Sequence, residues 1–169
     1  MAGIGDRDTM PTKQKVTKCM VVGDSIVRNV GAEHADMKVE CFPGIKTEQL
    51  HRVMEKRDLV SPETVIIHVG TNDLRTTRNL DFVMGKVYAL VSTAKKKLPN
   101  CRLVLNGVLR RTDVSWRYIG ALNDRFDWVA YTLGLTLRWS EQLDREWGLR
   151  WRWIASERKR TETTWTTIC

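Results

Sequence analysis

Short apolar runs alternate with amphipathic segments along most of this chain, and this order restricts the possible folds more than any other feature. Strands are expected at 19–22, 37–42, 64–69, 103–105 and 135–137. Apolar residues at helical spacing predict helices around 50–54, from 80 to 94 and from 119 to 133, the last one capped by Asp113 or Ser115. Because strands and helices alternate, we expect a parallel sheet with helices on both faces.

Small and polar residues follow three of the predicted strands. Ser25 follows the first strand, Gly44 the second and Asn72 the third. Because the carboxyl ends of parallel strands share one edge of the sheet, these residues should converge there. A serine at a strand-to-helix corner can attack a carbonyl group while the first N–H groups of the helix hold the oxyanion. The alternative is purely structural, since Asp24 or Ser25 could equally cap the helix-compatible segment that follows them, up to Asn29.

The composition is that of one ordinary globular domain. The chain has 169 residues, of which 42% are hydrophobic, enough for a proper core. No run of about 18 apolar residues predicts a membrane span, and the polar segment 1–17 is typical of a disordered lead-in rather than a secretory signal. The cysteines lack metal-ligand spacing, and Cys19, Cys41 and Cys101 are expected to pack as small hydrophobic residues. These features predict an intracellular, cytoplasmic protein without a membrane partner.

The net charge of +8 at pH 7 allows weak, salt-sensitive attraction to nucleic acid. The basic residues are scattered, however, and the one tight run, 95–97, lies at the expected end of a helix, where cations are favourable in any case. No heptad repeat predicts a coiled coil, so the oligomeric state stays open. No metal or organic cofactor is implied, because Asp24 and Asp73 lack further ligands at metal spacing.

Four segments carry a resemblance to a known family. In chain order within residues 18–137, they are VVGDSIVRN, FPGIKTEQL, VIIHVGTNDL and IGALNDRFDWV. The first three resemble three of the four sequence blocks of the SGNH (GDSL-type) hydrolases. More narrowly, all four are similar to the esterase-like domain in the first open reading frame of certain non-LTR retrotransposons. The resemblance implies a three-layer α/β/α flavodoxin-like fold with a central parallel sheet of about five strands. It also implies a serine esterase that hydrolyses acyl or acetyl esters.

The same resemblance implies a role for each matching residue. Ser25 would be the nucleophile, and its backbone N–H would join that of Gly44 and the side-chain amide of Asn72 in an oxyanion hole. These residue types suit that task, because an amide donates a hydrogen bond without carrying charge and glycine allows close approach to the substrate. The structural alternatives are an Asx-turn at Asn72 and a plain turn glycine at Gly44. The supporting residues would be Asp24, Gly70 and Asp73.

The fourth block of the family, an Asp-x-x-His segment that supplies the catalytic base, is missing. The three histidines, His34, His51 and His68, all precede the place where it belongs. His68 lies within a predicted strand and is expected to be a core residue, whereas His51 is expected to face outward from its helix. Without a base a serine hydroxyl is a weak nucleophile, so we expect an impaired esterase, a pseudoenzyme. The alternative is a non-catalytic nucleic-acid-binding or assembly module of a retroelement-derived protein.

The segment 138–169 departs from the family. It holds five of the seven tryptophans, namely Trp139, Trp147, Trp151, Trp153 and Trp165. Back-translation of WRWIAS, read one nucleotide later, permits Gly-Asp-Gly-Leu-His, which is similar to the missing block. We therefore expect a frameshift near Leu137 and a poorly ordered tail. The domain should be marginally stable, because it loses the helix that would close the fold. The alternative is a basic, tryptophan-rich extension that contacts nucleic acid.

Overall fold

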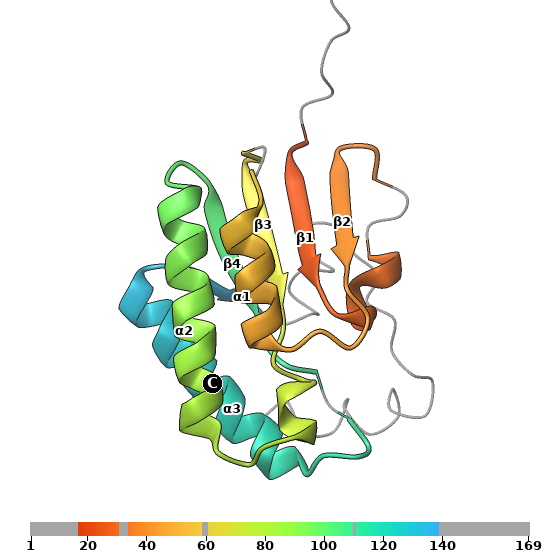
Figure 1. The fold of residues 1–169 in the computed structure, drawn as a ribbon, viewed down its shortest axis with the longest axis vertical. Helices are drawn as coiled ribbons and strands as arrows, with labels where there is room; N and C mark the ends of the chain where they lie inside the picture. The colour runs from red at the N-terminus through yellow and green to blue at the C-terminus, as the bar shows by residue number, and fades with distance from the viewer. Residues whose placement is uncertain (1–16, 31–33, 59–60, 110, 139–169) are drawn as a thin grey trace, which may run out of the picture.

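The central element is a sheet of five parallel strands, which the computed structural model places in the order β2-β1-β3-β4-β5. The structure describes residues 17–30, 34–58, 61–109 and 111–138. The strands are β1 (Cys19–Gly23), β2 (Met37–Cys41), β3 (Thr64–His68), β4 (Arg102–Asn106) and β5 (Thr136–Arg138) (Figure 1). The predicted five-stranded parallel sheet is therefore confirmed, and the strand ends differ from the predicted ones by no more than one residue.

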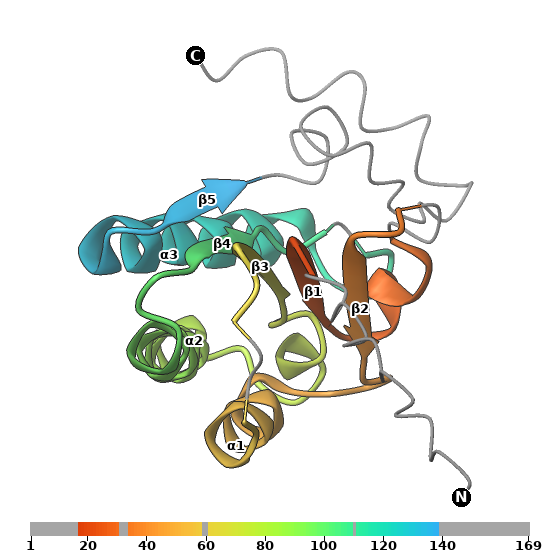
Figure 2. The ribbon, with the colours of Figure 1, turned by 90° about the horizontal axis from the view of Figure 1, so that it is seen from above.

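Helices cover both faces of the sheet, but unequally. The helical elements are η1 (Ser25–Asn29), α1 (Thr47–Lys56), η2 (Asp73–Arg75), α2 (Leu80–Lys97) and α3 (Trp116–Leu133), of which η1 and η2 are short 3-10 helices. The three α-helices share a hydrophobic cluster with one face of the strands, whereas η1 packs in a second cluster on the other face. Figure 2 shows α1 and α2 together on one side of the strands. Right-handed crossovers explain this, because the chain moves one way from β1 to β2 and the other way through β3, β4 and β5.

The two clusters explain why the central strands are continuous apolar runs. In β3, Val65 and Ile67 belong to the cluster beneath the α-helices, and Ile66 belongs to the cluster beneath η1. All three side chains are at most 1% exposed. Successive side chains of a strand point to opposite faces, so a strand that is buried on both faces shows no apolar–polar alternation. Burial of each such side chain contributes about 1.5–3 kcal/mol to stability.

Both ends of α3 follow from local capping. The hydroxyl of Ser115 accepts a hydrogen bond from the backbone N–H of Arg117, which selects Ser115 over Asp113 as the cap. Asp113 instead forms an ion pair with Arg111, whose Nε lies 2.7 Å from Oδ1 of the carboxylate. The helix ends at Gly134, whose φ of 66° is the left-handed conformation that glycine adopts at helix ends.

His51 does not face outward as the sequence predicted, but lies between α1 and α2. Its Nε2 is 2.7 Å from Oγ1 of Thr93 on α2 and 3.4 Å from Oε1 of Glu55, one turn further along α1. The prediction was wrong because α1 and α2 pack side by side over the sheet (Figure 2). The spacing of apolar residues within one helix does not show which neighbouring helix its flank will meet.

The free cysteines pack as the sequence predicted for small hydrophobic residues. Cys19 is buried in the cluster beneath η1, and burial raises the pKa of its thiol to about 11. The thiol therefore stays protonated at neutral pH and is a poor nucleophile. Cys41 and Cys101 are partly buried and pack against the second and the first cluster respectively.

Predictions about the ends of the chain concern residues outside the described ranges. The disordered lead-in was predicted for residues 1–17, of which the structure describes only residue 17. The aberrant tail was predicted for residues 138–169, of which the structure describes only residue 138. Both stay predictions. Within the described ranges, no helix is both long enough and apolar enough to span a bilayer.

Candidate active site

The three predicted site residues follow strand ends at one edge of the sheet. The register pairs Gly23, the last residue of β1, with the last residues of β2 and β3. Ser25, Gly44 and Asn72 come two, three and four residues after the ends of their strands. The chain leaves β1 in one direction and returns past it to β3, so this edge holds the topological switch point of the sheet (Figure 1). Open parallel sheets bind ligands at such a point.

The turn after β1 exposes Ser25 and caps η1 with Asp24. Oδ1 of Asp24 accepts a hydrogen bond from the backbone N–H of Ile26 at 3.0 Å, whereas Ser25 is exposed. Of the two capping candidates in the sequence, Asp24 therefore takes the structural role. Capping does not account for the serine, which stands at the first position of η1 where backbone N–H groups are free of helical partners.

Asn72 reaches across the edge of the sheet instead of forming a local turn. Although it precedes η2, its side chain makes no capping hydrogen bond to that helix. Nδ2 of Asn72 donates to the carbonyl oxygen of Ile45 at 3.1 Å and to Oδ2 of Asp24 at 3.5 Å. The residue is only 7% exposed. Its amide therefore links the loops that follow β1, β2 and β3, a geometry that the Asx-turn alternative does not describe.

Gly44 lies in a tight turn one residue before Ile45. Its φ is +75°, a backbone conformation that other residues rarely adopt. The turn is closed by a hydrogen bond of 3.1 Å from the N–H of Ile45 to the carbonyl oxygen of Phe42. A Cβ at position 44 would meet no atom within 4 Å. Glycine is thus required here by the backbone, and the space beside its Cα is open to an approaching molecule.

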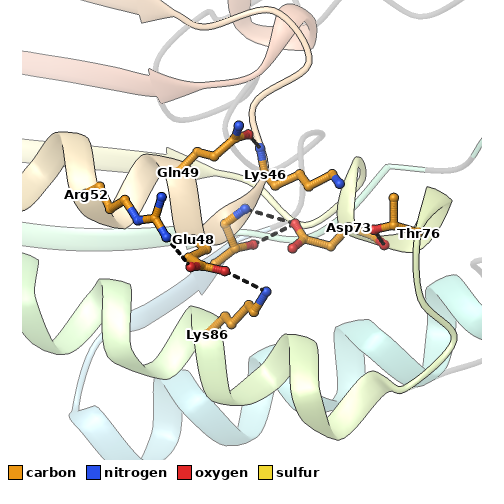
Figure 3. A network of polar contacts seen from close by, with 8 residues as sticks. Lys46, Glu48, Gln49, Arg52, Asp73, Thr76 and Lys86 are labelled. Carbon is orange, nitrogen blue, oxygen red and sulfur yellow. Dashed lines mark hydrogen bonds and ion pairs between the residues drawn. The ribbon is translucent and has the colours of Figure 1, made fainter.

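Asp73 and Gly70 hold the loop after β3 in place. Oδ2 of Asp73 accepts hydrogen bonds from the backbone N–H and the hydroxyl of Thr47, at 3.0 and 2.8 Å, and so caps α1 from another element (Figure 3). Gly70 has a φ of +109°, and a Cβ there would lie 2.8 Å from Cζ of Phe126. These contacts account for the glycine and the aspartate of the motif, and they fix Asn72 between them.

His68 is a buried core residue, as the sequence predicted, but it is also part of the site. Its ring is 0% exposed; Nδ1 lies 2.9 Å from Nδ2 of Asn106, and Nε2 lies 3.8 Å from Oδ1 of Asp24. Asn106 was predicted only as the end of a strand and not as a residue of the site. The available signal was its position, because it ends an apolar strand at the same edge as Gly23 and His68 end theirs.

We expect the free energy of unfolding to fall when the pH is lowered below neutrality, because His68 must stay neutral in the folded chain. Burial lowers the pKa of His68, and the nearby carboxylate of Asp24 offsets this only in part. The unfolded chain therefore takes up a proton at a higher pH than the folded chain. The stabilisation is fully present above the unfolded pKa of about 6.5 and is lost as the pH falls below it, by up to about 1.4 kcal/mol per pH unit.

Urea unfolding at pH values of about 7.5, 6.5 and 5.5 measures this dependence. His68→Gln should flatten the profile because its side chain does not titrate. The control, His51→Gln, should keep most of the dependence, since it removes a histidine between α1 and α2 and leaves His68 in place. An unmodified chain whose stability is constant across this range would contradict the assignment to His68.

The described histidines do not stand where a catalytic base is needed. His34 precedes β2 at the opposite edge of the sheet, His51 lies between two helices, and His68 is fully buried. Among the described residues there is also no group of three His, Cys, Asp or Glu side chains that could hold a metal ion. This part of the chain thus provides an exposed serine and a set of fixed hydrogen-bond donors.

Comparison with solved structures finds this fold in several esterases. The psychrotrophic esterase EstA from Pseudoalteromonas sp., solved with the inhibitor monoethylphosphonate, is 18% identical with a TM-score of 0.57, and the match covers 75% of this chain and 79% of that one. A member of the lipolytic protein G-D-S-L family from Veillonella parvula is 14% identical with a TM-score of 0.58, covering 70% and 75%. AlinE4, an SGNH-hydrolase family esterase, is 14% identical with a TM-score of 0.54, covering 72% and 75%. At these identities the likeness shows the fold, which confirms the predicted SGNH-hydrolase architecture. No protein-family model and no curated protein matches the sequence.

Proposed function

We propose that this chain carries the domain of an SGNH-type serine hydrolase that acts on acyl or acetyl esters. In this proposal Ser25 attacks the ester carbonyl, and the backbone N–H groups of Ser25 and Gly44 together with Nδ2 of Asn72 hold the oxyanion. The observation that carries the proposal is the position of Asn72, whose buried amide links the loop of Gly44 to the turn of Ser25 instead of capping η2. The esterases that share the fold support it.

The hydrogen bonds of Asn72 suit an oxyanion donor. Its Nδ2 carries two hydrogens. One has a good partner in the carbonyl oxygen of Ile45 at 3.1 Å, whereas the contact with Asp24 at 3.5 Å is at the outer limit of a hydrogen bond. A substrate oxyanion can therefore take the second hydrogen at little cost while the first keeps the amide fixed. A donor that is fixed in advance stabilises the transition state by about 2.7–4 kcal/mol.

The base is the missing part, and we propose that it is encoded after Leu137 in a shifted reading frame. β5 runs parallel to β4 and pairs Arg138 with Asn106, so a segment encoded in the restored frame would leave β5 at the edge of the sheet where Ser25 lies. A histidine in that segment could reach the serine. Because general-base catalysis contributes about 10²–10⁴-fold, we expect little turnover from the chain as given.

By the same resemblance we propose that the domain derives from the first open reading frame of a non-LTR retrotransposon. Such a protein would act in the cytoplasm on a small ester. Its net charge of +8 would add weak attraction to nucleic acid, which is the property on which the non-catalytic alternative depends. The sequence motifs and this charge are what support the retroelement origin.

Hydrolysis of p-nitrophenyl acetate tests the proposal. Four proteins are compared: the chain as given, its Ser25→Ala variant, a frame-restored protein in which the reading frame is shifted near Leu137, and the frame-restored protein with Ser25→Ala. We expect turnover from the frame-restored protein, background hydrolysis from its Ser25→Ala variant, and little from the chain as given. Nucleic-acid binding, measured in parallel, should be the same in all Ser25 variants.

Two outcomes would change the account. If the frame-restored protein folds but shows no hydrolysis that depends on Ser25, the non-catalytic binding module becomes the better explanation. If the chain as given is active and its own Ser25→Ala variant is not, a base within this chain serves the serine and the frameshift proposal fails. A gene without the Asp-x-x-His reading in the shifted frame would also end the frameshift proposal, but not the proposed esterase ancestry.

A further inference from the structure

Four buried polar side chains form a line across the carboxyl edge of the sheet. Nδ2 of Asn106, at the end of β4, lies 2.9 Å from Nδ1 of His68, at the end of β3. Nε2 of the same ring lies 3.8 Å from Oδ1 of Asp24, whose other oxygen accepts from Asn72. His68 and Asn106 are fully buried, and Asp24 and Asn72 are nearly so. The line ends at the residue before the serine and at the proposed oxyanion donor.

The charge of Asp24 decides which nitrogen of His68 carries the proton. The 3.8 Å between Nε2 and Oδ1 is too long for a hydrogen bond, so the contact is electrostatic: a lone pair on Nε2 would repel the carboxylate oxygen, whereas an N–H is attracted to it. The proton therefore belongs on Nε2, and Nδ1 is the acceptor for the amide N–H of Asn106. A second proton is disfavoured by complete burial, which lowers the pKa of His68 despite the nearby carboxylate.

Close packing of β1 and β3 holds this ring in place. A Cβ at Gly23 would lie 2.3 Å from the carbonyl oxygen of His68 and 3.1 Å from its Cβ. The two backbones approach this closely because position 23 is glycine. Gly23 immediately precedes Asp24. The close approach of the strands therefore brings the Cβ of His68, where its side chain begins, close to Asp24.

We propose that His68 is a positioning residue for the oxyanion hole: its neutral, Nε2-protonated ring attracts the carboxylate of Asp24 across 3.8 Å, and that carboxylate in turn orients the amide of Asn72 before the substrate arrives. The ring and the N–H of Ile26 both lie on the Oδ1 side of Asp24, which leaves Oδ2 directed toward Asn72. The catalytic consequence rests on the proposed function, whereas the positioning itself is a property of the folded chain.

Two amide substitutions separate the roles of the two ring nitrogens. In His68→Gln the side-chain amide extends to the place of Nε2 and keeps a donor toward Asp24, whereas in His68→Asn it extends only to the place of Nδ1. In nitrogen-labelled full-length chain, we expect His68→Gln to leave the side-chain amide resonances of Asn72 near their original positions and His68→Asn to shift them. His51→Gln is the matched control and should not shift them, and Asn72→Ser identifies the resonances.

The protonation state can be measured without any substitution, so the proposal does not depend on the variants folding. Long-range proton–nitrogen correlation spectra of the unmodified chain at neutral pH should show His68 with a protonated Nε2 and an unprotonated Nδ1. A ring protonated on Nδ1 would overturn the proposal. So would Asn72 resonances that are identical in the Gln and Asn variants.

The catalytic consequence is measured in the frame-restored protein. There, His68→Asn should lower kcat for p-nitrophenyl acetate about 10- to 100-fold with little change in KM, and His68→Gln should recover most of the loss. Equal kcat in the two variants would remove the link to catalysis. If the frame-restored protein shows no hydrolysis that depends on Ser25, the proposed function fails, and the spectra alone still decide whether His68 positions Asn72.

Discussion

Replacing Asn72 with alanine in the frame-restored protein is expected to lower kcat for p-nitrophenyl acetate about 10²–10³-fold, while KM changes little. The reason is that the amide hydrogen of Asn72 would stabilise negative charge that develops only in the transition state. Its two partners come from two other loops: the carbonyl oxygen of Ile45 holds the amide throughout the reaction, whereas Oδ2 of Asp24 orients the second hydrogen until the oxyanion takes it. Steady-state kinetics, with the unfolding free energy of each variant measured alongside, give the comparison.

Asn123→Ala is the matched control for this substitution. Asn123 is 3% exposed, and its amide bonds both the N–H and the carbonyl oxygen of Val108, at 2.7 and 3.0 Å. Both substitutions leave buried backbone groups without their partner, so both should lower stability by about 1–3 kcal/mol. Only the loss of Asn72 should lower kcat by orders of magnitude. Similar kinetic losses in the two variants would mean that weakened folding, and not a lost oxyanion donor, explains the effect.

The sheet could be predicted from the local sequence because each residue of a strand is apolar or polar according to whether its side chain is buried. Val65, Ile66 and Ile67 are buried although they alternate between two faces, so their apolar run indicates a central parallel strand. The strand ends could also be predicted, since each strand stops at or just before a glycine, a proline or a polar residue. The order of these elements predicts a parallel sheet, and parallel strands all end on the same side. Ser25 and Asn72, which follow strand ends, are therefore expected at that edge.

Contacts between elements could not be predicted in this way. Asp73 caps α1 through Thr47, which lies 26 positions earlier in the chain. His51 meets Thr93 across 42 positions, and Asn106 meets His68 across 38. Each pairing depends on how two elements pack, and nothing in the periodicity of either element specifies it. The place of Ser25, Gly44 and Asn72 after strands thus predicted that they share one edge of the sheet, and the family resemblance supplied their expected roles. The buried side chains that hold them could not be predicted.

Gly23→Ala is expected to lower the free energy of unfolding by about 3 kcal/mol or more, which is a large fraction of the total for a typical domain. The added Cβ would lie 2.3 Å from the backbone carbonyl oxygen of His68, which is shorter than any van der Waals contact between these atoms. That oxygen belongs to a central strand and cannot turn away as a flexible side chain could. β1 and β3 would have to separate at the edge of the sheet where Asp24 and Asn72 meet. Urea unfolding of the full chain measures the loss.

Two other glycines distinguish this steric effect from the general consequence of adding a methyl group. Gly120→Ala lies within α3 where no atom is within 4 Å of the new Cβ, so it should stabilise the chain by about 0.5–1 kcal/mol through helix propensity. Gly44→Ala also meets open space, but its φ of +75° should cost about 1–2 kcal/mol. The expected order of stability is Gly120→Ala, then Gly44→Ala, then Gly23→Ala. A Gly23→Ala variant as stable as Gly44→Ala would show that β1 and β3 can separate at little cost. The close approach of these strands would then not be what holds His68 beside the turn of Ser25.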